Sequence, residues 1–147
     1  MYLRSPICYN GAYEQWGAAP SAPRKGCVIV LNLGHRGFSG KYPENTMLAY
    51  RKAVEAGADG VELDVQLTKD GEVVVIHDER VDRTTDGQGF VRDFTLADLR
   101  KLDASYLYKQ AGVRNPVPTF EEYCEWAAAA GCITNVELKN GVYPYPA

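Results

Sequence analysis

Acidic side chains and a histidine gather in the stretch Gly60–Asp78, which reads GVELDVQLTKDGEVVVIHD. Within it Glu62 and Asp64 alternate with apolar residues, which is the period-two pattern of a β-strand with two different faces. Their side chains should therefore point the same way, roughly 6–7 Å apart along the strand. Carboxylates in this arrangement suit a hard cation. The exposed face of an ordinary amphipathic hairpin is an equally good interpretation of this stretch alone.

A predicted hairpin brings an imidazole toward these carboxylates. Asp70-Gly71 is a strong two-residue turn signal because glycine accepts a positive φ, and Val73–Ile76 is a second β-branched run. With Asp70 and Gly71 as the loop, Asp64 faces His77, and directly opposed residues share a face. A three-residue loop would shift the register by one and move His77 to the other face. An imidazole next to a cation site suits acid–base chemistry.

A second histidine follows the apolar run Val28–Leu33, which has the length and composition of a strand buried on both faces. The run leads into Gly34–Gly37 (GHRG), whose glycines let the backbone turn tightly and leave room for a ligand. His35 and Arg36 would then lie just past a buried strand, where α/β folds place their chemistry. A loop histidine with local hydrogen bonds and a surface ion pair are the plainer interpretations.

The elements that must position these residues form a predicted βαβ unit. Pro43–Thr46 opens a helix that Asn45 or Thr46 can cap and that Gly57 ends. The strand–helix–strand order from Val28 to Gln66 implies a parallel pair with a right-handed crossover. Glu44 is either an acidic residue favoured beside a helix N-terminus or an active-site group.

Two further helices and a strand are predicted after the hairpin. The helices cover Thr95–Leu102 and Thr119–Ala130, and the second begins with a capping box. The strand covers Ile133–Leu138. In it Glu137 shares a face with Lys139, which repeats the polar pair of the earlier strand, although a charged strand edge would look the same.

The composition predicts one modest soluble domain. The 147 residues are 46% hydrophobic and 24% charged, which is ordinary for a globular protein. A net charge of −3 and the lack of a basic run give no argument for nucleic acid. No apolar stretch approaches the roughly 20 residues of a transmembrane segment, and no secretory signal is visible. The four cysteines lack CxxC spacing, which favours reduced thiols in a cytoplasmic protein.

Together these motifs resemble the glycerophosphodiester phosphodiesterase family. They follow the family's order from about residue 28 to residue 140: GHRG (34–37), PENT (43–46), VELDVQLTKDG (61–71), VVVIHD (73–78), RTTDGQG (83–89), VPTFEE (117–122) and VELK (136–139). The resemblance implies an α/β fold of the TIM-barrel type and a divalent cation, Mg²⁺ or Ca²⁺. It also implies hydrolysis of small-molecule glycerophosphodiesters to glycerol 3-phosphate and an alcohol.

The resemblance further implies a role for each polar residue of these motifs. The metal ligands would be Glu62, Asp64 and Glu137. The acid–base pair would be His35 and His77. The groups that hold phosphate oxygens would be Arg36 and Lys139. Glu44 would contact the metal or the substrate.

The chain is too short for a whole barrel. A TIM barrel takes about 250 residues and eight strands, whereas this sequence offers three or four strands. We therefore expect residues 28–147 to form the N-terminal half of a barrel after an irregular extension over residues 1–27. An open half-barrel exposes sheet edges and an apolar face. The chain would then be a fragment of a longer polypeptide, be completed by a partner or second copy, or take a compact inactive form, and alone it should associate or aggregate.

Three functions are compatible with the sequence. The first is a metal-dependent glycerophosphodiesterase. The second is a non-catalytic barrel fragment that binds cation or phosphate as an interaction module. The third is a phospholipid phosphodiesterase similar to the sphingomyelinase D enzymes. GHRG and VELK together favour the first over the third, and only turnover separates the first from the second.

Overall fold

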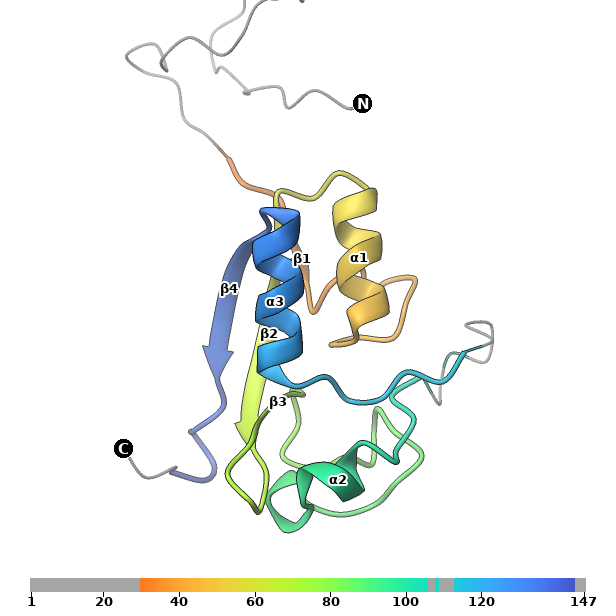
Figure 1. The fold of residues 1–147 in the computed structure, drawn as a ribbon, viewed down its shortest axis with the longest axis vertical. Coiled ribbons are helices and arrows are strands. Elements are labelled where there is room, and N and C mark those ends of the chain that lie inside the picture. Colours follow the sequence, from red (N-terminus) through yellow and green to blue (C-terminus); the bar gives the residue numbers. More distant parts are fainter. Residues whose placement is uncertain (1–29, 106–107, 109–112, 145–147) are drawn as a thin grey trace, which may run out of the picture. The chain divides into compact units, whose positions relative to one another are not determined.

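A four-stranded sheet is built around its longest strand, β2 (Gly60–Leu67) (Figure 1). β4 (Ile133–Leu138) runs parallel to β2 from Gly60 to Val65. On the opposite edge β1 (Leu33–His35) pairs in parallel with the beginning of β2, and β3 (Val73–Val75) pairs antiparallel with its end. The parallel pairing of β1 with β2 confirms the predicted βαβ unit. Within the described part of the chain no strand pairs with the outer edge of β4, so the sheet is open there.

The computed structural model describes residues 30–105, 108 and 113–144, so the predicted extension over residues 1–27 lies outside the described residues. The helical elements are α1 (Met47–Glu55), the 3₁₀ turn η1 (Val91–Asp93), α2 (Leu96–Leu99) and α3 (Phe120–Ala130). None of the helices in these ranges has the length and apolar character that crossing a membrane requires.

α1 and α3 cover one face of the sheet and form the main core with it (Figure 1). Tyr50 of α1 and Tyr123 of α3 are buried, and their rings meet edge to face with centroids 5.0 Å apart. Both belong to one core with three apolar side chains of β2, Val61, Leu63 and Val65. Because side chains alternate along a strand, the polar residues of β2 point to the other face of the sheet.

The caps predicted for the two longer helices are confirmed. The Thr46 hydroxyl accepts a hydrogen bond from the Ala49 N–H at the start of α1. Thr119 and Glu122 form the capping box of α3, which ends at Gly131 in the left-handed region with φ of 61°. α2 is shorter than the predicted helix, because the chain turns after Leu99 and packs Leu102 into a second core.

That second core supports the segment between β3 and α3. Its buried residues are Val74, Ile76, Val81, Val91, Leu99, Ala104 and Val117. They hold the loop that follows β3 against the end of the sheet. This loop matters for function because it carries several charged residues described below.

The strand predicted over Val28–Leu33 is wrong in position. β1 begins only at Leu33. Val30 and Leu31 belong to no strand, and 67% and 47% of their respective surfaces are exposed. The register explains the difference. Leu33 pairs with Gly60, the first residue of β2, and the Asp59 side chain accepts a hydrogen bond from the Asn32 N–H just before it. The pairing with β2 therefore begins at Leu33, five residues later than the start of the predicted strand.

The hairpin register also differs from the two-residue-loop prediction. Val65 pairs with Val75, and the Ile76 N–H donates to the Asp64 carbonyl, so Asp64 faces Ile76 and not His77. The loop has three residues, Lys69 to Gly71. It is held by the Thr68 hydroxyl, which accepts from the Glu72 N–H, and by Asp70, which accepts from the Leu96 N–H of α2. The observed loop is thus the three-residue alternative, held by one local hydrogen bond and by one contact with a distant helix.

Candidate active site

The polar face of β2 carries two carboxylates, and β4 adds a third. Asp64 is completely buried, so the exposed-hairpin interpretation of this face is wrong. In the parallel register Glu137 lies opposite Asp64, while Glu62 is two residues away on β2. One oxygen from each of these three carboxylates lies within 4.8 Å of the other two. The structure therefore brings together all three residues for which the family resemblance implies metal binding.

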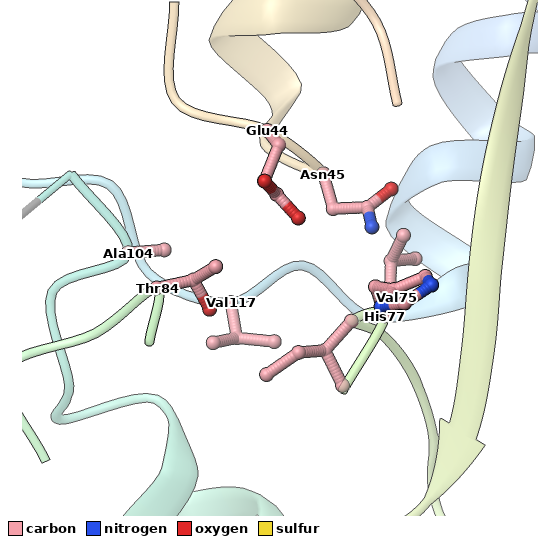
Figure 2. A pocket seen from close by; sticks show the side chains of 8 residues that line it. Glu44, Asn45, Val75, His77, Thr84, Ala104 and Val117 are labelled. Carbon is pink, nitrogen blue, oxygen red and sulfur yellow. The ribbon is translucent and has the colours of Figure 1, made fainter. Parts of the chain in front are cut away.

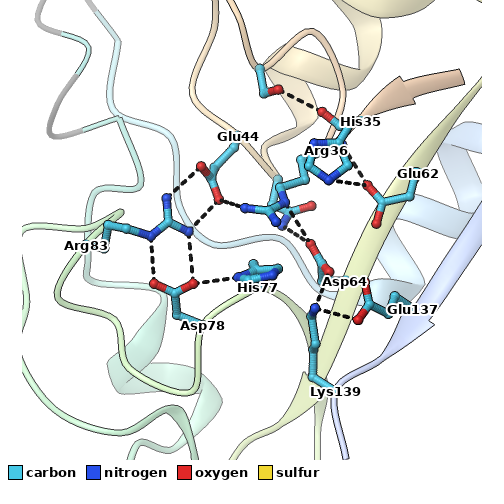
Figure 3. A network of polar contacts seen from close by, with 12 residues as sticks. His35, Arg36, Glu44, Glu62, Asp64, His77, Asp78, Arg83, Glu137 and Lys139 are labelled. Atoms are coloured by element: carbon cyan, nitrogen blue, oxygen red, sulfur yellow. Dashed lines mark hydrogen bonds and ion pairs between the residues drawn. The ribbon is translucent and has the colours of Figure 1, made fainter. Parts of the chain in front are cut away.

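Two cationic side chains surround the buried carboxylate of Asp64 (Figure 3). Lys139 Nζ lies 3.1 Å from Asp64 Oδ1 and 2.6 Å from Glu137 Oε1, and Arg36 Nε lies 3.4 Å from Asp64 Oδ2. Burial alone would lower the pKa of Lys139, but its ion pairs with Glu137 and Asp64 outweigh burial and the pKa lies above its usual value. Lys139 is therefore a charged partner of the acidic cluster.

The GHRG turn presents His35 and Arg36 at the end of β1. The Arg36 backbone is in the left-handed region, with φ of 55°, and its N–H donates to Glu62 Oε2 at 2.9 Å. Gly37 follows with φ of 80°, and a Cβ there would lie 2.7 Å from the Ala49 backbone, so α1 packs directly on the turn. His35 Nε2 lies 3.9 Å from Glu62 Oε2, and its side chain is 68% exposed.

His77 joins the same network although Asp64 faces Ile76 across the hairpin. It comes after the end of β3, so strand alternation does not control its direction, and Gln66 Nε2 donates to its carbonyl. His77 Nδ1 lies 2.6 Å from Asp78 Oδ1. Since a carboxylate only accepts, Nδ1 carries the proton and Nε2 is left to exchange one with another group. In Figure 3 the rings of His35 and His77 both lie at the network around Asp64.

Glu44 lies between two arginines. Its carboxylate accepts from Arg36 Nη1 at 3.0 Å and from both terminal nitrogens of Arg83 at 2.8 Å. The hydrogen bond from Arg83 is the largest cause that holds the pKa of Glu44 below its ordinary value. Arg83 also lowers the pKa of Asp78 to about 2. Both carboxylates are therefore ionised at neutral pH.

Three residues of this network were not identified from the sequence. Asn45, which was considered only as a helix cap, donates to Asp64 Oδ2 at 2.9 Å and accepts from the Tyr50 hydroxyl at 2.7 Å. Its positive φ of 54° is a conformation that asparagine adopts more readily than most residues, and this was the available signal. Asp78 and Arg83 stood only as members of longer motifs, because a charged pair in a polar loop is usually a surface pair.

A small cavity lies beneath His77 (Figure 2). Its volume is about 10 Å³, and its polar lining comes from Glu44, Asn45, His77 and Thr84. That volume holds one water molecule at most, far less than the roughly 300–1,000 Å³ of a ligand pocket. The cavity is thus part of the packing around His77.

The acid stability of the fold should depend on Asp78. Its pKa in the folded chain is lowered to about 2 from 3.8, so its contribution to stability is fully present above about pH 4 and is lost as the pH falls toward 2. Because the group is partly exposed, we expect a contribution of roughly 1 kcal/mol. Urea unfolding of wild type and Asp78→Asn at pH 5 and about pH 2.5 measures it. The two proteins should differ in the free energy of unfolding at pH 5 and converge in acid, whereas a constant difference would contradict the assignment.

Comparison with known proteins places this geometry in one family. The model of the glycerophosphoryl diester phosphodiesterase family matches residues 35–143. A glycerophosphodiester phosphodiesterase of Caldanaerobacter subterraneus is 51% identical over 117 residues, which cover 80% of this chain and 48% of that protein. One from Bacillus subtilis is 46% identical over 114 residues, which cover 69% of this chain and 39% of that protein.

Solved structures show the same relationship in the fold. The glycerophosphodiester phosphodiesterase of Agrobacterium tumefaciens superposes with a TM-score of 0.67 at 37% identity, over 71% of this chain and 45% of that one. An Oleispira antarctica phosphodiesterase in complex with the product sn-glycerol-3-phosphate superposes with a TM-score of 0.68 at 42% identity, over 71% and 42% of the two chains.

The chain therefore spans about half the length of the relatives that it matches. The predicted fold is confirmed in this respect, because the structural relatives are TIM barrels and the open sheet corresponds to part of one barrel. The family match includes the carboxylates of β2 and β4, both histidines and the arginine of the GHRG turn. This protein belongs to the glycerophosphoryl diester phosphodiesterase family.

Proposed function

We propose that this chain carries the catalytic half of a barrel that hydrolyses glycerophosphodiesters to glycerol 3-phosphate and an alcohol. The convergence of Glu62, Asp64 and Glu137 beside two histidines is the observation that carries the proposal. The names of its relatives and the product bound to the Oleispira phosphodiesterase support this substrate class. The comparisons favour neither an interaction module nor a sphingomyelinase D-like enzyme.

The carboxylate cluster fits a divalent cation held by Glu62, Asp64 and Glu137. Asp64 Oδ1 is buried and accepts no hydrogen bond, although Lys139 Nζ lies close to it. The ligand oxygens lie within 4.8 Å of one another. Opposite ligands of one ion are about 4.1 Å apart for Mg²⁺ and about 4.6–5.2 Å apart for Ca²⁺. The three carboxylates are therefore close enough together for one hard cation to contact all of them, and the distances do not distinguish Ca²⁺ from Mg²⁺.

The net charge of the network also favours a bound divalent cation. Its carboxylates outnumber its cationic side chains by two: the acids are Glu44, Glu62, Asp64, Asp78 and Glu137, and the cations are Arg36, Arg83 and Lys139. A divalent cation would neutralise this excess. When bound, such an ion polarises the phosphate oxygens and offsets their negative charge.

The remaining residues supply binding and proton transfer. Arg36 and Lys139 would hold phosphate oxygens through charge-assisted hydrogen bonds. A glycerol hydroxyl would attack phosphorus, form a new P–O bond and expel the head-group alcohol, and water would then open the cyclic phosphate. In the first step one histidine accepts the hydroxyl proton and the other donates a proton to the departing oxygen. The proton held on His77 Nδ1 by Asp78 leaves Nε2 for this exchange.

The experiment that tests this function must supply the rest of the barrel. We would fuse this chain to the C-terminal half of the Caldanaerobacter relative and assay glycerophosphocholine hydrolysis with Mg²⁺, with Ca²⁺ and after chelation. We expect cation-dependent release of glycerol 3-phosphate. A folded fusion protein without turnover under any of these conditions would refute the proposal.

The isolated chain should be examined beside the fusion by light scattering. Ile133, Val136 and Leu138 on β4 expose 39%, 36% and 69% of their surface. Burial stabilises by roughly 25 cal/mol per Å² of apolar surface, so we propose that the isolated chain associates through this open side of the sheet. A stable, fully active monomer would contradict that proposal.

Lys139 should oppose cation binding while it assists catalysis. Its ammonium group already contacts two of the proposed ligands, Asp64 and Glu137, so it competes with the ion and repels it. Lys139→Met should therefore tighten Mg²⁺ or Ca²⁺ binding roughly 10-fold, measured by calorimetry without substrate, and should lower kcat/KM. Lys101→Met is the control, because Lys101, just after α2, pairs in the same way with Asp98 of α2. Weaker cation binding in Lys139→Met would contradict the competition.

A further inference from the structure

Arg83 makes more contacts with the site than its position in a polar loop suggests. Its side chain is 45% exposed, yet its guanidinium group makes four hydrogen bonds to two carboxylates (Figure 3). Nε and Nη2 donate to Asp78 at 2.7 and 3.0 Å. Nη1 and Nη2 donate to Glu44, both at 2.8 Å. Each carboxylate is therefore held in bidentate geometry, which fixes its orientation as well as its charge.

The two carboxylates bound by Arg83 contact different residues of the site. Asp78 Oδ1 accepts from His77 Nδ1 at 2.6 Å, and Glu44 Oε1 accepts from Arg36 Nη1 at 3.0 Å. A continuous chain of hydrogen bonds therefore runs from Arg36 through Glu44, Arg83 and Asp78 to His77. It connects the loop before α1 with the loop after β3, and within the described residues Arg83 is the link that joins its two halves.

A plain surface ion pair would not need this arrangement. Exposed ion pairs typically contribute about 0–1 kcal/mol to the free energy of unfolding, so the ion pairs of Arg83 add little to the stability of the fold. Its geometric effect is larger. Without Arg83 the Asp78 carboxylate can rotate away from His77, and the Nδ1 proton is then no longer confined to one tautomer. The Glu44 carboxylate likewise loses two of its three donors.

We propose that Arg83 is a positioning residue that fixes the His77 tautomer through Asp78 and the Arg36 side chain through Glu44. Its effect on turnover rests on the proposed function, in which His77 moves a proton and Arg36 holds the phosphate. Its effect on the imidazole does not, because the tautomer is a property of the protein alone. The two consequences can therefore be measured separately.

The ¹⁵N NMR spectrum of the imidazoles in the fusion protein tests the positioning role. The chain contains only two histidines, so His35→Ala assigns the signals of this half. We expect wild type to hold His77 as the Nδ1–H tautomer and Arg83→Gln to show a mixture. Arg83→Lys keeps the charge but cannot hold two carboxylates in bidentate geometry, so it should also show a mixture, and it decides the question if Arg83→Gln does not fold.

Arg80→Gln is the matched control. Arg80 lies in the same loop, is 48% exposed and donates in the same bidentate way to Asp82, which is not linked to His77. Arg83→Gln should lower turnover roughly 10–100-fold, and Arg80→Gln should leave both turnover and tautomer unchanged. A His77 spectrum in Arg83→Gln and Arg83→Lys identical to that of Arg80→Gln would overturn the proposal. A changed spectrum with unchanged turnover would uphold the positioning role and contradict its expected effect on turnover.

Discussion

Replacing Asp64 with asparagine should weaken divalent-cation binding by more than about 100-fold, because loss of even an outer partner of a metal site costs about 10–100-fold. Asp64 is 0% exposed and is the central carboxylate of the cluster, paired across the sheet with Glu137. Asparagine has the same shape as aspartate but no negative charge, and a hard cation binds a neutral amide oxygen less strongly than a carboxylate. Calorimetry with Mg²⁺ and Ca²⁺ on the fusion protein measures the loss.

The control separates loss of a ligand from loss of the fold. Asp98→Asn also removes one carboxylate that is paired with a lysine, but on α2 and away from the cluster. It should leave cation binding unchanged. Because Asp64 also faces Arg36 and Lys139, thermal unfolding of Asp64→Asn must show that the protein is folded at the temperature of the titration. A folded Asp64→Asn protein with wild-type affinity would remove Asp64 from the proposed site.

Local patterns predicted the parts of the fold that depend on neighbouring residues. The alternation along β2, the Thr46 cap and the capping box of α3 each depend on residues within a few positions of one another. The sequence did not decide between a two-residue and a three-residue hairpin loop, and the observed three-residue loop is held in part by Asp70 bonding to Leu96, 26 residues away. No property of the Asp70-Gly71 dipeptide reports that contact.

The site shows the same division between local and distant information. Alternation predicted that Glu62 and Asp64 share a face, but not whether this face meets water. It is buried at Asp64 because the GHRG turn and Lys139, from distant parts of the chain, cover it. The hydrogen bonds of Arg83 to Glu44 join residues 39 positions apart. Neither loop contains a sequence pattern that predicts its contact with the other loop. Family motifs supplied the residues, and only the structure supplied their connections.

Removing either histidine should cost about 10²–10⁴-fold in turnover, which is the usual contribution of general acid–base catalysis. The fold should be unaffected by His35→Ala, because that side chain is 68% exposed and lies 3.9 Å from its nearest charged partner, Glu62. His77→Ala removes the partner of one Asp78 oxygen, but Arg83 still holds that carboxylate. Cation binding should survive in both variants, so a loss of turnover reports on proton transfer. Near-wild-type turnover in either variant would exclude that histidine from the mechanism.

A change of leaving group then shows which histidine is the acid. A nitrophenolate departs without a proton, whereas an alkoxide such as that of choline requires one. The variant that lacks the general acid should therefore recover most of its turnover on a glycerophosphodiester of nitrophenol, and the variant that lacks the base should not. The Asp78 contact leaves His77 with a free Nε2, and this nitrogen serves as a base when neutral and as an acid when protonated. Equal recovery in both variants would contradict a division of labour between the two histidines, because two groups with separate roles cannot both be made dispensable by one change in the leaving oxygen.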